Sequence, residues 1–363
     1  MKNVLEILKI SSAFIGIIVG AGFASGQEIL QYFTSFGHMG TAAAIISTAL
    51  FAYLGMTLTR LGSRVRAASH RGVIYKISGR HLGPIVDGVI IFTLFGTAVV
   101  MIAGAGSILH QQFNFPPFVG SLLLVVLATL TVMMNVEKVI AVIGSITPFL
   151  ILAIILIGVY SVFTMDASLQ ALEPIAKEQT SAVSNWWLAG INYASFNVTF
   201  GAAMTLVMGG AIKSERTAAL GGLVGGLVLG VLILLSHFAL FSKVDQVAHV
   251  DMPMLQIVTD ISPVLSIFMT IILFGMIFNT GVSMIYSFVA RFVDMNTKQS
   301  TTFTIITSLA AFIASFAGFT VLVNWFYPVV GYLGLFLILA LIIAPFRIPK
   351  QPEGKTKNKQ AVS

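Results

Sequence analysis

The chain contains no cysteine and very little charge, and both absences limit what it is. Without cysteine it forms neither a disulfide framework nor a thiolate metal site. Only 9% of its 363 residues are charged, whereas a soluble domain carries roughly 25%. Hydrophobic residues make up 57% of the chain. Such a chain cannot cover its surface against water, so we predict that it lies in the lipid bilayer.

The sequence also lacks the motifs of common hydrolases. It holds no HExxH, no GxSxG and no convincing pair of nucleophile and base. We therefore predict that the protein is not an enzyme and carries no cofactor. Its net charge of +7 does not indicate a nucleic-acid partner, because the basic residues flank apolar segments, as they do in membrane proteins.

Apolar segments long enough to cross a bilayer recur along the whole chain. We predict ten spans in a single transmembrane domain, residues 1–348. The polar tail at 349–363 is expected to be disordered and cytoplasmic. The predicted spans are residues 7–33, 39–58, 85–110, 117–136, 139–164, 186–212, 218–241, 261–289, 302–319 and 322–346.

The basic residues orient these spans. With the N-terminus in the cytoplasm, every one of the 20 Lys and Arg residues except Lys177 and Lys243 falls on the inner side. An error of one span would scramble this separation. We predict a multi-pass protein of the bacterial inner membrane with both termini cytoplasmic, and the interfacial Trp186 and Trp325 lie on the predicted outer side.

The spans divide into two halves of nearly equal length, about residues 7–165 and 186–346. Because five is odd, the second half enters the membrane from the opposite side. This layout predicts an all-α membrane fold built from a 5+5 inverted repeat, which is common in secondary transporters. No clear identity between residues of the two halves supports the repeat, which rests on the number of spans and on where helices break.

The first span of each half contains a run that disfavours a continuous helix. In span one, glycines stand at positions 16, 20, 22 and 26, and Gln27 and Glu28 follow. In span six, residues 192–201 read NYASFNVTFG. Glycine costs roughly 1 kcal/mol per helical position relative to alanine, and unwound backbone inside a bilayer must line a cavity or be buried in protein. We predict that both spans are broken, although the glycine spacing in span one also suits close helix packing. The glycine run at 221–230 is predicted to be a packing face.

These features resemble a known architecture. Ten spans with breaks in spans one and six resemble the LeuT fold of the amino acid–polyamine–organocation (APC) superfamily. The segment 13–28, AFIGIIVGAGFASGQE, and the size of the chain resemble more closely the YkvI-type bacterial membrane proteins. The resemblance implies a substrate pocket between the two breaks. Its residues would be the backbone amides of Gly20, Ala21 and Gly22, and, facing them, Asn197 and Thr199.

In sodium-coupled relatives of this fold an ion lies between carbonyls of span one and hydroxyls of span eight. The matching positions here are Gly16 and Val19 in span one and Thr280 and Ser283 in span eight. Such relatives often carry two adjacent hydroxyl residues, whereas Met284 follows Ser283 here. No basic residue occurs within span five, which mildly favours sodium over a proton as the coupling ion.

Four polar residues inside the spans are further candidates. A carboxylate such as Glu28 costs about 2.5–3.5 kcal/mol in the hydrocarbon region, so we predict a functional role, with proton carriage as one option. Asn279 is predicted to serve the ion or substrate site. Asp87 is either functional or simply solvated near the inner end of span three. His237 suits a hydrogen-bonded packing residue better than a proton relay.

Together these features predict a secondary transporter. Its substrate would be a small molecule, an amino acid or a related organic ion, moved with Na⁺ or H⁺ by alternating access. A channel and a membrane sensor or partner subunit are the alternatives. The expected partners are the lipid bilayer and the small-molecule substrate. The protein is expected to act as a monomer or a homodimer.

Overall fold

The computed structural model describes residues 2–67, 70–134, 147–295 and 297–347, and its ordered segments are helices. The predicted tail at 349–363 and the start of the fifth predicted span lie outside the described residues. The helices are α1 (Lys2–Ile18), α2 (Ala21–Ser25), α3 (Gln27–Tyr32), the 3₁₀ turn η1 (Thr34–Phe36), α4 (His38–Val65), α5 (His70–Phe113), α6 (Pro117–Met133), α8 (Thr147–Phe163), α9 (Leu169–Lys177), α10 (Trp186–Ala211), α11 (Glu215–Ser242), α12 (Val244–Val247), α13 (Pro253–Ile261), α14 (Pro263–Phe292), α15 (Lys298–Ser315) and α16 (Phe319–Arg347).

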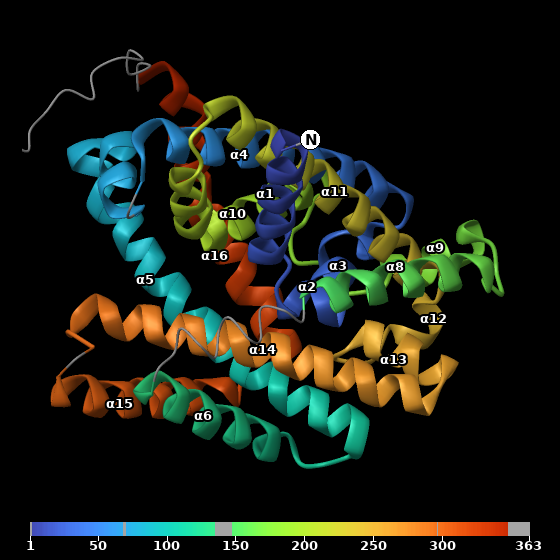
Figure 1. Cartoon of the computed structure of the whole chain (residues 1–363). Coiled ribbons are helices and arrows are strands. Elements are labelled where there is room, and N and C mark those ends of the chain that lie inside the picture. Colours follow the sequence, from blue (N-terminus) through green and yellow to red (C-terminus); the bar gives the residue numbers. More distant parts are fainter. Residues whose placement is uncertain (1, 68–69, 135–146, 296, 348–363) are drawn as a thin grey trace, which may run out of the picture.

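Two groups of long helices make up the body of the molecule (Figure 1). In the first group, α4 packs extensively against α10 and α11, and α1 lies on α11 and α10. In the second group, α5 packs against α14, α6 and α15. Helix α16 contacts both groups through α10 and α5. Residues at the N-termini of several helices favour helix initiation. Pro117 and Pro263 stand in the first turns of α6 and α14, and the hydroxyl of Ser214 caps α11.

Glycines allow the helices of the first group to approach closely. A Cβ atom on Gly222 of α11 would lie 2.2 Å from the carbonyl oxygen of Gly55 in α4. A Cβ on Gly62 would lie 2.1 Å from the carbonyl oxygen of Leu206 in α10. Backbone therefore packs on backbone, which is how membrane helices gain contact area without a hydrophobic driving force. The prediction that the glycine run of α11 is a packing face is confirmed.

Six helices are long and apolar enough to cross a membrane, namely α4, the part of α5 from Val86, α10, α11, α14 and α16 up to Ile343. Helix α6 and residues Pro148–Phe163 are apolar but shorter. The protein is therefore a membrane protein with several spanning helices. The third predicted span, residues 85–110, agrees with the apolar part of α5, Val86–Phe113, although the helix itself begins at His70. Hydropathy marks only the apolar part of a helix, whereas helix propagation continues into polar sequence once a nucleus exists.

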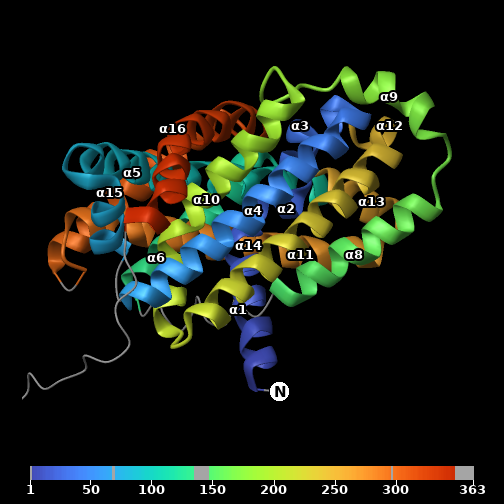
Figure 2. The same ribbon diagram turned by 90° about the horizontal axis from the view of Figure 1, so that it is seen from above.

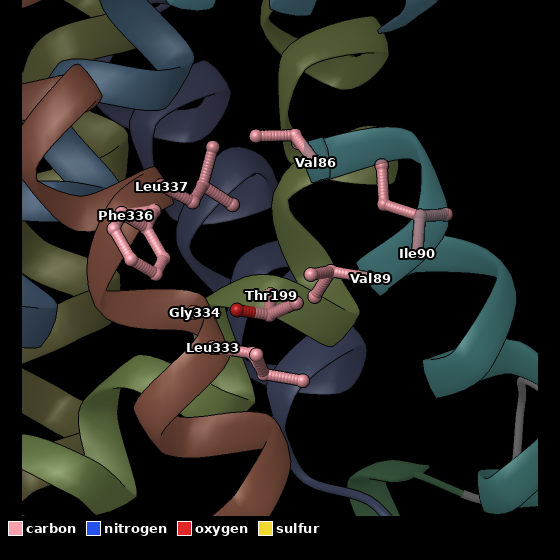
Figure 3. A pocket seen from close by; sticks show the side chains of 8 residues that line it. All are labelled: Val86, Val89, Ile90, Thr199, Leu333, Gly334, Phe336 and Leu337. Carbon is pink, nitrogen blue, oxygen red and sulfur yellow. The ribbon is translucent and has the colours of Figure 1, made fainter. Parts of the chain in front are cut away.

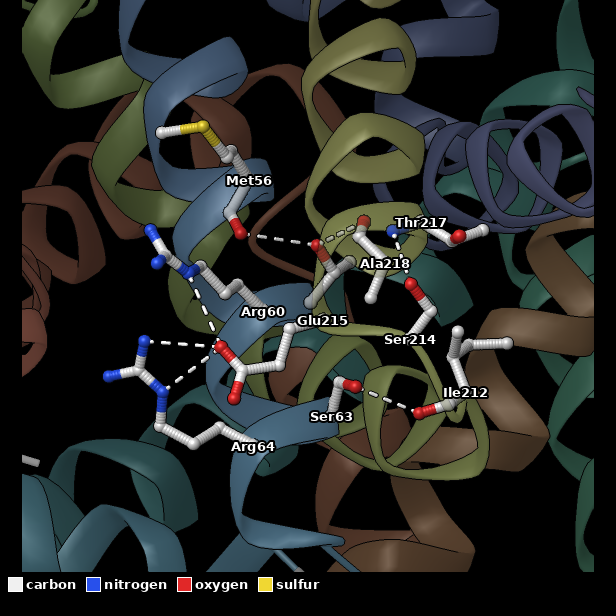
Figure 4. Close-up of polar contacts among 10 residues, drawn as sticks. Met56, Arg60, Ser63, Arg64, Ile212, Ser214, Glu215, Thr217 and Ala218 are labelled. Carbon is white, nitrogen blue, oxygen red and sulfur yellow. Dashed lines mark hydrogen bonds and ion pairs between the residues drawn. The ribbon is translucent and has the colours of Figure 1, made fainter. Parts of the chain in front are cut away.

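The two ends of the bundle differ in charge. One end, which we call the arginine face, carries Arg60 and Arg64 of α4, and both contact the carboxylate of Glu215 at the start of α11 (Figure 4). Beside them the hydroxyl of Ser63 donates to the carbonyl of Ile212, 2.8 Å away. These contacts tie α4 to α11. The opposite end, which carries α9 and α12, we call the α9 face.

Helix α1 departs from the direction of its neighbours. It runs steeply across α11, and its N-terminal end projects from the bundle (Figure 2). Leu5 and Leu8 near this end are 57% and 53% exposed. An open groove of about 420 Å³ lies beside the helix, lined by Leu5, Glu6, Lys9, Ile10 and Ile212. The Ser11 hydroxyl, which donates to the carbonyl of Gly221 at 2.9 Å, attaches the middle of α1 to α11.

Candidate functional site

The predicted break in the first span is confirmed. Helix α1 ends at Ile18, Val19 and Gly20 are not helical, and α2 starts at Ala21. A second interruption follows at Gly26, whose φ of +86° is in the left-handed region that favours glycine. A Cβ there would also meet Met254 at 2.8 Å. The first span is therefore divided into one long helix, α1, and two short ones, α2 and α3.

Glu28, in the first turn of α3, is buried at this break, with 4% of its surface exposed. The hydroxyl of Tyr193 in α10 donates to its carboxyl Oε2 at 3.2 Å. The other oxygen, Oε1, lies against Gly22, where a Cβ would be only 1.9 Å away. Among the described residues no Lys, Arg or His forms an ion pair with Glu28. The carboxyl group thus lies against the Gly22 backbone without a positive partner.

A second polar contact joins α3 to α10 one helical turn further along. The hydroxyl of Tyr32 donates to Asn192 Oδ1 at 3.0 Å, and Asn192 Nδ2 donates to the carbonyl of Pro328 in α16 at 3.1 Å. Asn192 fills the space left by Gly331, since a Cβ there would lie 2.2 Å from Asn192 Oδ1. These residues were not predicted as site residues. The available signal was the spacing of Glu28 and Tyr32, which lie four apart on one helix face.

Aromatic rings surround these contacts. Tyr193 lies 5.3 Å from Tyr32, 4.8 Å from Phe33 and 5.1 Å from Phe196, measured between ring centroids. We call seven of these connected rings the aromatic cluster, namely Tyr32, Phe33, Phe51, Tyr193, Phe196, Phe200 and Tyr327. The ring contacts continue from Tyr327 to Phe326 and Phe92. The Glu28 carboxyl therefore adjoins this cluster through the hydroxyl of Tyr193.

The predicted break in the sixth span is wrong. Helix α10 is continuous from Trp186 to Ala211. Two of its polar residues bond to their own helix: Asn197 Nδ2 donates to the carbonyl of Tyr193 at 3.1 Å, and Thr199 Oγ1 donates to that of Ser195 at 2.8 Å. Such bonds to the preceding turn remove the need for unwound backbone.

Asn197 and Thr199, both predicted to hold substrate, lie at different places. Asn197 is buried one turn beyond Tyr193. Thr199 faces α16 and α5 at a recess of about 10 Å³, roughly the space of one water molecule (Figure 3). The other lining residues are Val86, Val89, Ile90, Leu333, Gly334, Phe336 and Leu337. This recess is too small for a solute, so in this conformation Thr199 serves packing.

The residues predicted to bind an ion lie on α1, just before the break, and on α14. Val19 closes the last turn of α1 with a 2.7 Å bond to the carbonyl of Ile15, and Gly16 lies within α1. Thr280 and Ser283 are half-buried on α14, which packs against α2 immediately after the break. Asn279 on α14 has a buried side-chain oxygen without a hydrogen-bond partner. The ion site remains a prediction.

Asp87 and His237 both have structural partners. Asp87 forms an ion pair with Arg291 and so joins α5 to α14. His237 is fully buried, its two ring nitrogens lie 3.2 Å from the hydroxyls of Thr34 and Thr41, and its ring stacks on Phe241. With both nitrogens engaged, His237 matches the predicted hydrogen-bonded packing residue.

The α9 face above the site is closed by a carboxylate in the loop before α13. Asp251 accepts hydrogen bonds from Ser107 of α5 at 2.6 Å and from Thr320 of α16 at 2.5 Å. Gln111 binds both the amide and the carbonyl of Met252 at 3.0 Å. The loop thus joins the two helix groups.

Ion pairs also line this face. The Lys243 ammonium donates to Asp166 at 2.9 Å, and it lowers the pKa of that exposed carboxyl below its usual value. In the same way Lys177 lowers the pKa of Glu173. Both carboxylates lie at the surface, so their ion pairs contribute little to stability.

We expect Asp251→Ala to open this face. Losing two hydrogen bonds to a charged group should raise the exposure of buried Gln31 on α3 by about tenfold. Because the chain has no cysteine, Gln31→Cys is a single reporter whose rate of labelling by a polar maleimide is measured in detergent. Asp260→Ala, which removes an exposed carboxylate from α13, is the control. Equal labelling rates in Asp251→Ala and wild type would contradict the closing role.

Two relatives from Bacillus subtilis (strain 168) match the chain along nearly its whole length. The uncharacterized membrane protein YkvI is 27% identical over 337 residues, which cover 92% of this chain and 94% of the relative. The uncharacterized protein YyaD is 25% identical over 333 residues, with 91% and 94% covered. No family model matches the chain. The predicted resemblance to YkvI-type membrane proteins is confirmed.

Solved structures show the fold. MhsT in complex with L-phenylalanine matches with a TM-score of 0.63 at 18% identity, over 94% of this chain and 96% of that one. Mhp1 in its inward-facing conformation matches at 0.56 and 13%, over 92% and 75%. A variant of the Eremococcus coleocola manganese transporter matches at 0.57 and 16%, over 93% and 79%. These solved proteins are transporters with the LeuT fold, and the chain has their fold, as predicted.

Proposed function

We propose that this LeuT-fold membrane protein is a secondary transporter that moves a small solute by alternating access. The observation that carries the proposal is the buried carboxyl of Glu28 at a break in the first span, enclosed by α10 and the aromatic cluster. A carboxyl group in the hydrocarbon region is costly and marks a functional site by default. Non-helical backbone at membrane depth has the same meaning, because it must face protein or a cavity.

The helix arrangement supports ten spans in a 5+5 inverted repeat. The first group of helices holds α1 and α4 from the first half and α10 and α11 from the second. The second group holds α5 and α6 from the first half and α14 and α15 from the second. Helices at corresponding places in the two halves thus pack together, as expected for a repeat. We propose the arginine face as cytoplasmic, in agreement with the positive-inside rule.

The two faces support alternating access. The α9 face is closed by Asp251, whereas the open groove beside α1 lies next to Ile212, at the arginine face. The α1 segment before the break also projects from the bundle (Figure 2). An arrangement that is closed at one face and loosened at the other is what rocking of one helix group against the other requires.

For the substrate we propose an amino acid or a related organic ion, coupled to Na⁺ or H⁺. MhsT, which binds L-phenylalanine, supports amino acids as the first class to test. Glu28 is our candidate proton carrier. For Na⁺ the candidates remain Gly16, Val19, Thr280 and Ser283. Packing of α14 on α2, directly after the break, supports this assignment.

Uptake into proteoliposomes tests the transport proposal. We expect saturable uptake of at least one labelled amino acid or amine, driven by an imposed Na⁺ or proton gradient, and at least a tenfold loss in Glu28→Gln. Glu173→Gln, which removes a surface carboxylate of α9, is the matched control. Flux that neither saturates nor responds to a gradient would favour the channel. No flux of any solute, together with a stable soluble partner, would favour the sensor.

A further inference from the structure

The open groove of about 420 Å³ beside α1 combines apolar and charged walls. Helix α1 contributes Leu5, Glu6, Lys9 and Ile10, which share one helix face, and the end of α10 contributes Ile212. The volume lies in the range of pockets that bind small ligands. Because this half of α1 projects from the bundle (Figure 2), packing within the chain leaves the groove open.

Three basic side chains belong to this groove or to residues next to it. Lys9 lines it, and Lys213 follows the lining residue Ile212. The Arg66 guanidinium donates to the carbonyl of Ile212 at 3.0 Å and to that of Lys213 at 3.2 Å. All three basic residues are exposed, and none forms an ion pair within the described part of the chain. Against them stands one lining carboxylate, Glu6, so positive charge is in excess.

The position of Lys9 along the chain suits a contact with lipid head groups. It stands near the start of the first predicted span, residues 7–33, at the depth where basic side chains meet anionic lipids. The apolar side chains of Val4 and Leu8 are exposed on the same part of α1. A lysine that stands among exposed apolar side chains matches a ligand with a hydrocarbon part and a negatively charged head.

Charge argues against the C-terminal tail of the chain as the occupant. Residues 349–363 hold four lysines and a single acidic residue, Glu353. A basic segment would be repelled by Lys9 and Lys213. A soluble anion would be attracted to these lysines, but it would leave the apolar walls of the groove in water.

We propose that the groove beside α1 binds an anionic phospholipid of the phosphatidylglycerol type. Its phosphate would meet the ammonium groups of Lys9 and Lys213. Its acyl chains would follow the apolar side chains of Leu5 and Ile212. A hydroxyl of the glycerol head group would donate a hydrogen bond to the Glu6 carboxylate, which gives the acidic wall of the groove a partner. A lipid in this place fills the space between α1 and the end of α10, and so holds α1 in its projecting position.

The test uses matched lipids on the purified full-length protein in detergent, with the melting temperature as the measure of binding. Dioleoyl phosphatidylglycerol and dioleoyl phosphatidylcholine have the same acyl chains and differ in net charge. We expect the anionic lipid to bind at least tenfold more tightly, and this preference to shrink as salt is added. Glycerol 3-phosphate, which carries the charge without the chains, should not stabilise the protein at millimolar concentration.

Variants assign the preference to the groove. Lys9→Gln should lower the affinity for the anionic lipid about fivefold, the usual effect of one basic residue at a membrane surface. Adding Lys213→Gln should reduce the affinity to that for phosphatidylcholine. Lys298→Gln removes an exposed basic residue from the start of α15, in the other helix group, and should leave the affinity unchanged.

Three results would overturn the proposal. Equal affinity for the two lipids would show that the groove does not select charge. An equal loss of affinity in Lys9→Gln and Lys298→Gln, or none in either, would place the lipid elsewhere on the surface. Stabilisation by glycerol 3-phosphate as strong as that by the lipid would indicate a site for a soluble anion. The lipid site does not depend on the transport proposal, so the absence of solute uptake would leave it standing.

Discussion

Gly22→Ala is expected to remove solute binding and uptake while leaving the helix bundle folded. The new Cβ would lie 1.9 Å from Glu28 Oε1 and 2.7 Å from its Cδ, so the carboxyl group must move. Moving it breaks the 3.2 Å bond from Tyr193. We expect uptake to fall roughly tenfold or more, as in Glu28→Gln, because the carboxyl group leaves its place at the break.

The fold should survive this change because the atoms that the Cβ meets belong to the end of a side chain and not to backbone. The measurement is uptake into proteoliposomes, with the elution profile and melting temperature of each variant as checks on folding. Gly88→Ala is the control, since a Cβ on Gly88 of α5 meets nothing within 4 Å. Unchanged uptake by Gly22→Ala would show that the position of the Glu28 carboxyl does not matter.

Gly222→Ala is expected to destabilise the protein, whereas the same change at Gly281 stabilises it or has no effect. At Gly222 the Cβ would meet backbone, 2.2 Å from the carbonyl oxygen of Gly55 and 2.5 Å from the Thr59 hydroxyl. Overpacking of this kind costs about 1–3 kcal/mol. At Gly281 in α14 the nearest atoms are 3.5 Å and 3.7 Å away, which is ordinary contact. There alanine gains up to about 1 kcal/mol of helix propensity.

Thermal unfolding in detergent compares the two variants. The opposite signs are the informative part, because both glycines lie inside long helices of similar hydropathy. If Gly222→Ala melts at the wild-type temperature, α4 and α11 do not approach as closely as their backbones indicate. If both variants are destabilised equally, alanine is simply unfavourable in these helices and the packing argument fails.

The sequence by itself determined the membrane class and the first break. Nine per cent charge and recurrent apolar segments require lipid as solvent, and no tertiary contact alters that balance. The break at Val19 and Gly20 was predictable because clustered glycines act locally, through the cost of each helical residue. The likeness of the segment 13–28 to YkvI-type proteins was also visible in the sequence, because it depends on the order of residues alone.

Only the tertiary structure decided how the polar residues of α10 are used. The sequence signal at residues 192–201 resembled that of the first span, and it predicted a second break. Asn197 and Thr199 instead bond to their own helix, and α10 stays intact. Whether a polar side chain in a membrane turns to its own backbone or to a distant partner depends on which neighbours the fold supplies.

The partners of Glu28 were also beyond the sequence. The cost of placing a carboxylate in the hydrocarbon region marked Glu28 as functional from its position in an apolar segment. Tyr193 lies 165 positions away along the chain, and Asn192 meets Tyr32 only because α10 packs beside α3. Burial cost belongs to a residue type and is readable from the chain, whereas the pairing that offsets it belongs to the packing of helices and is set by the fold.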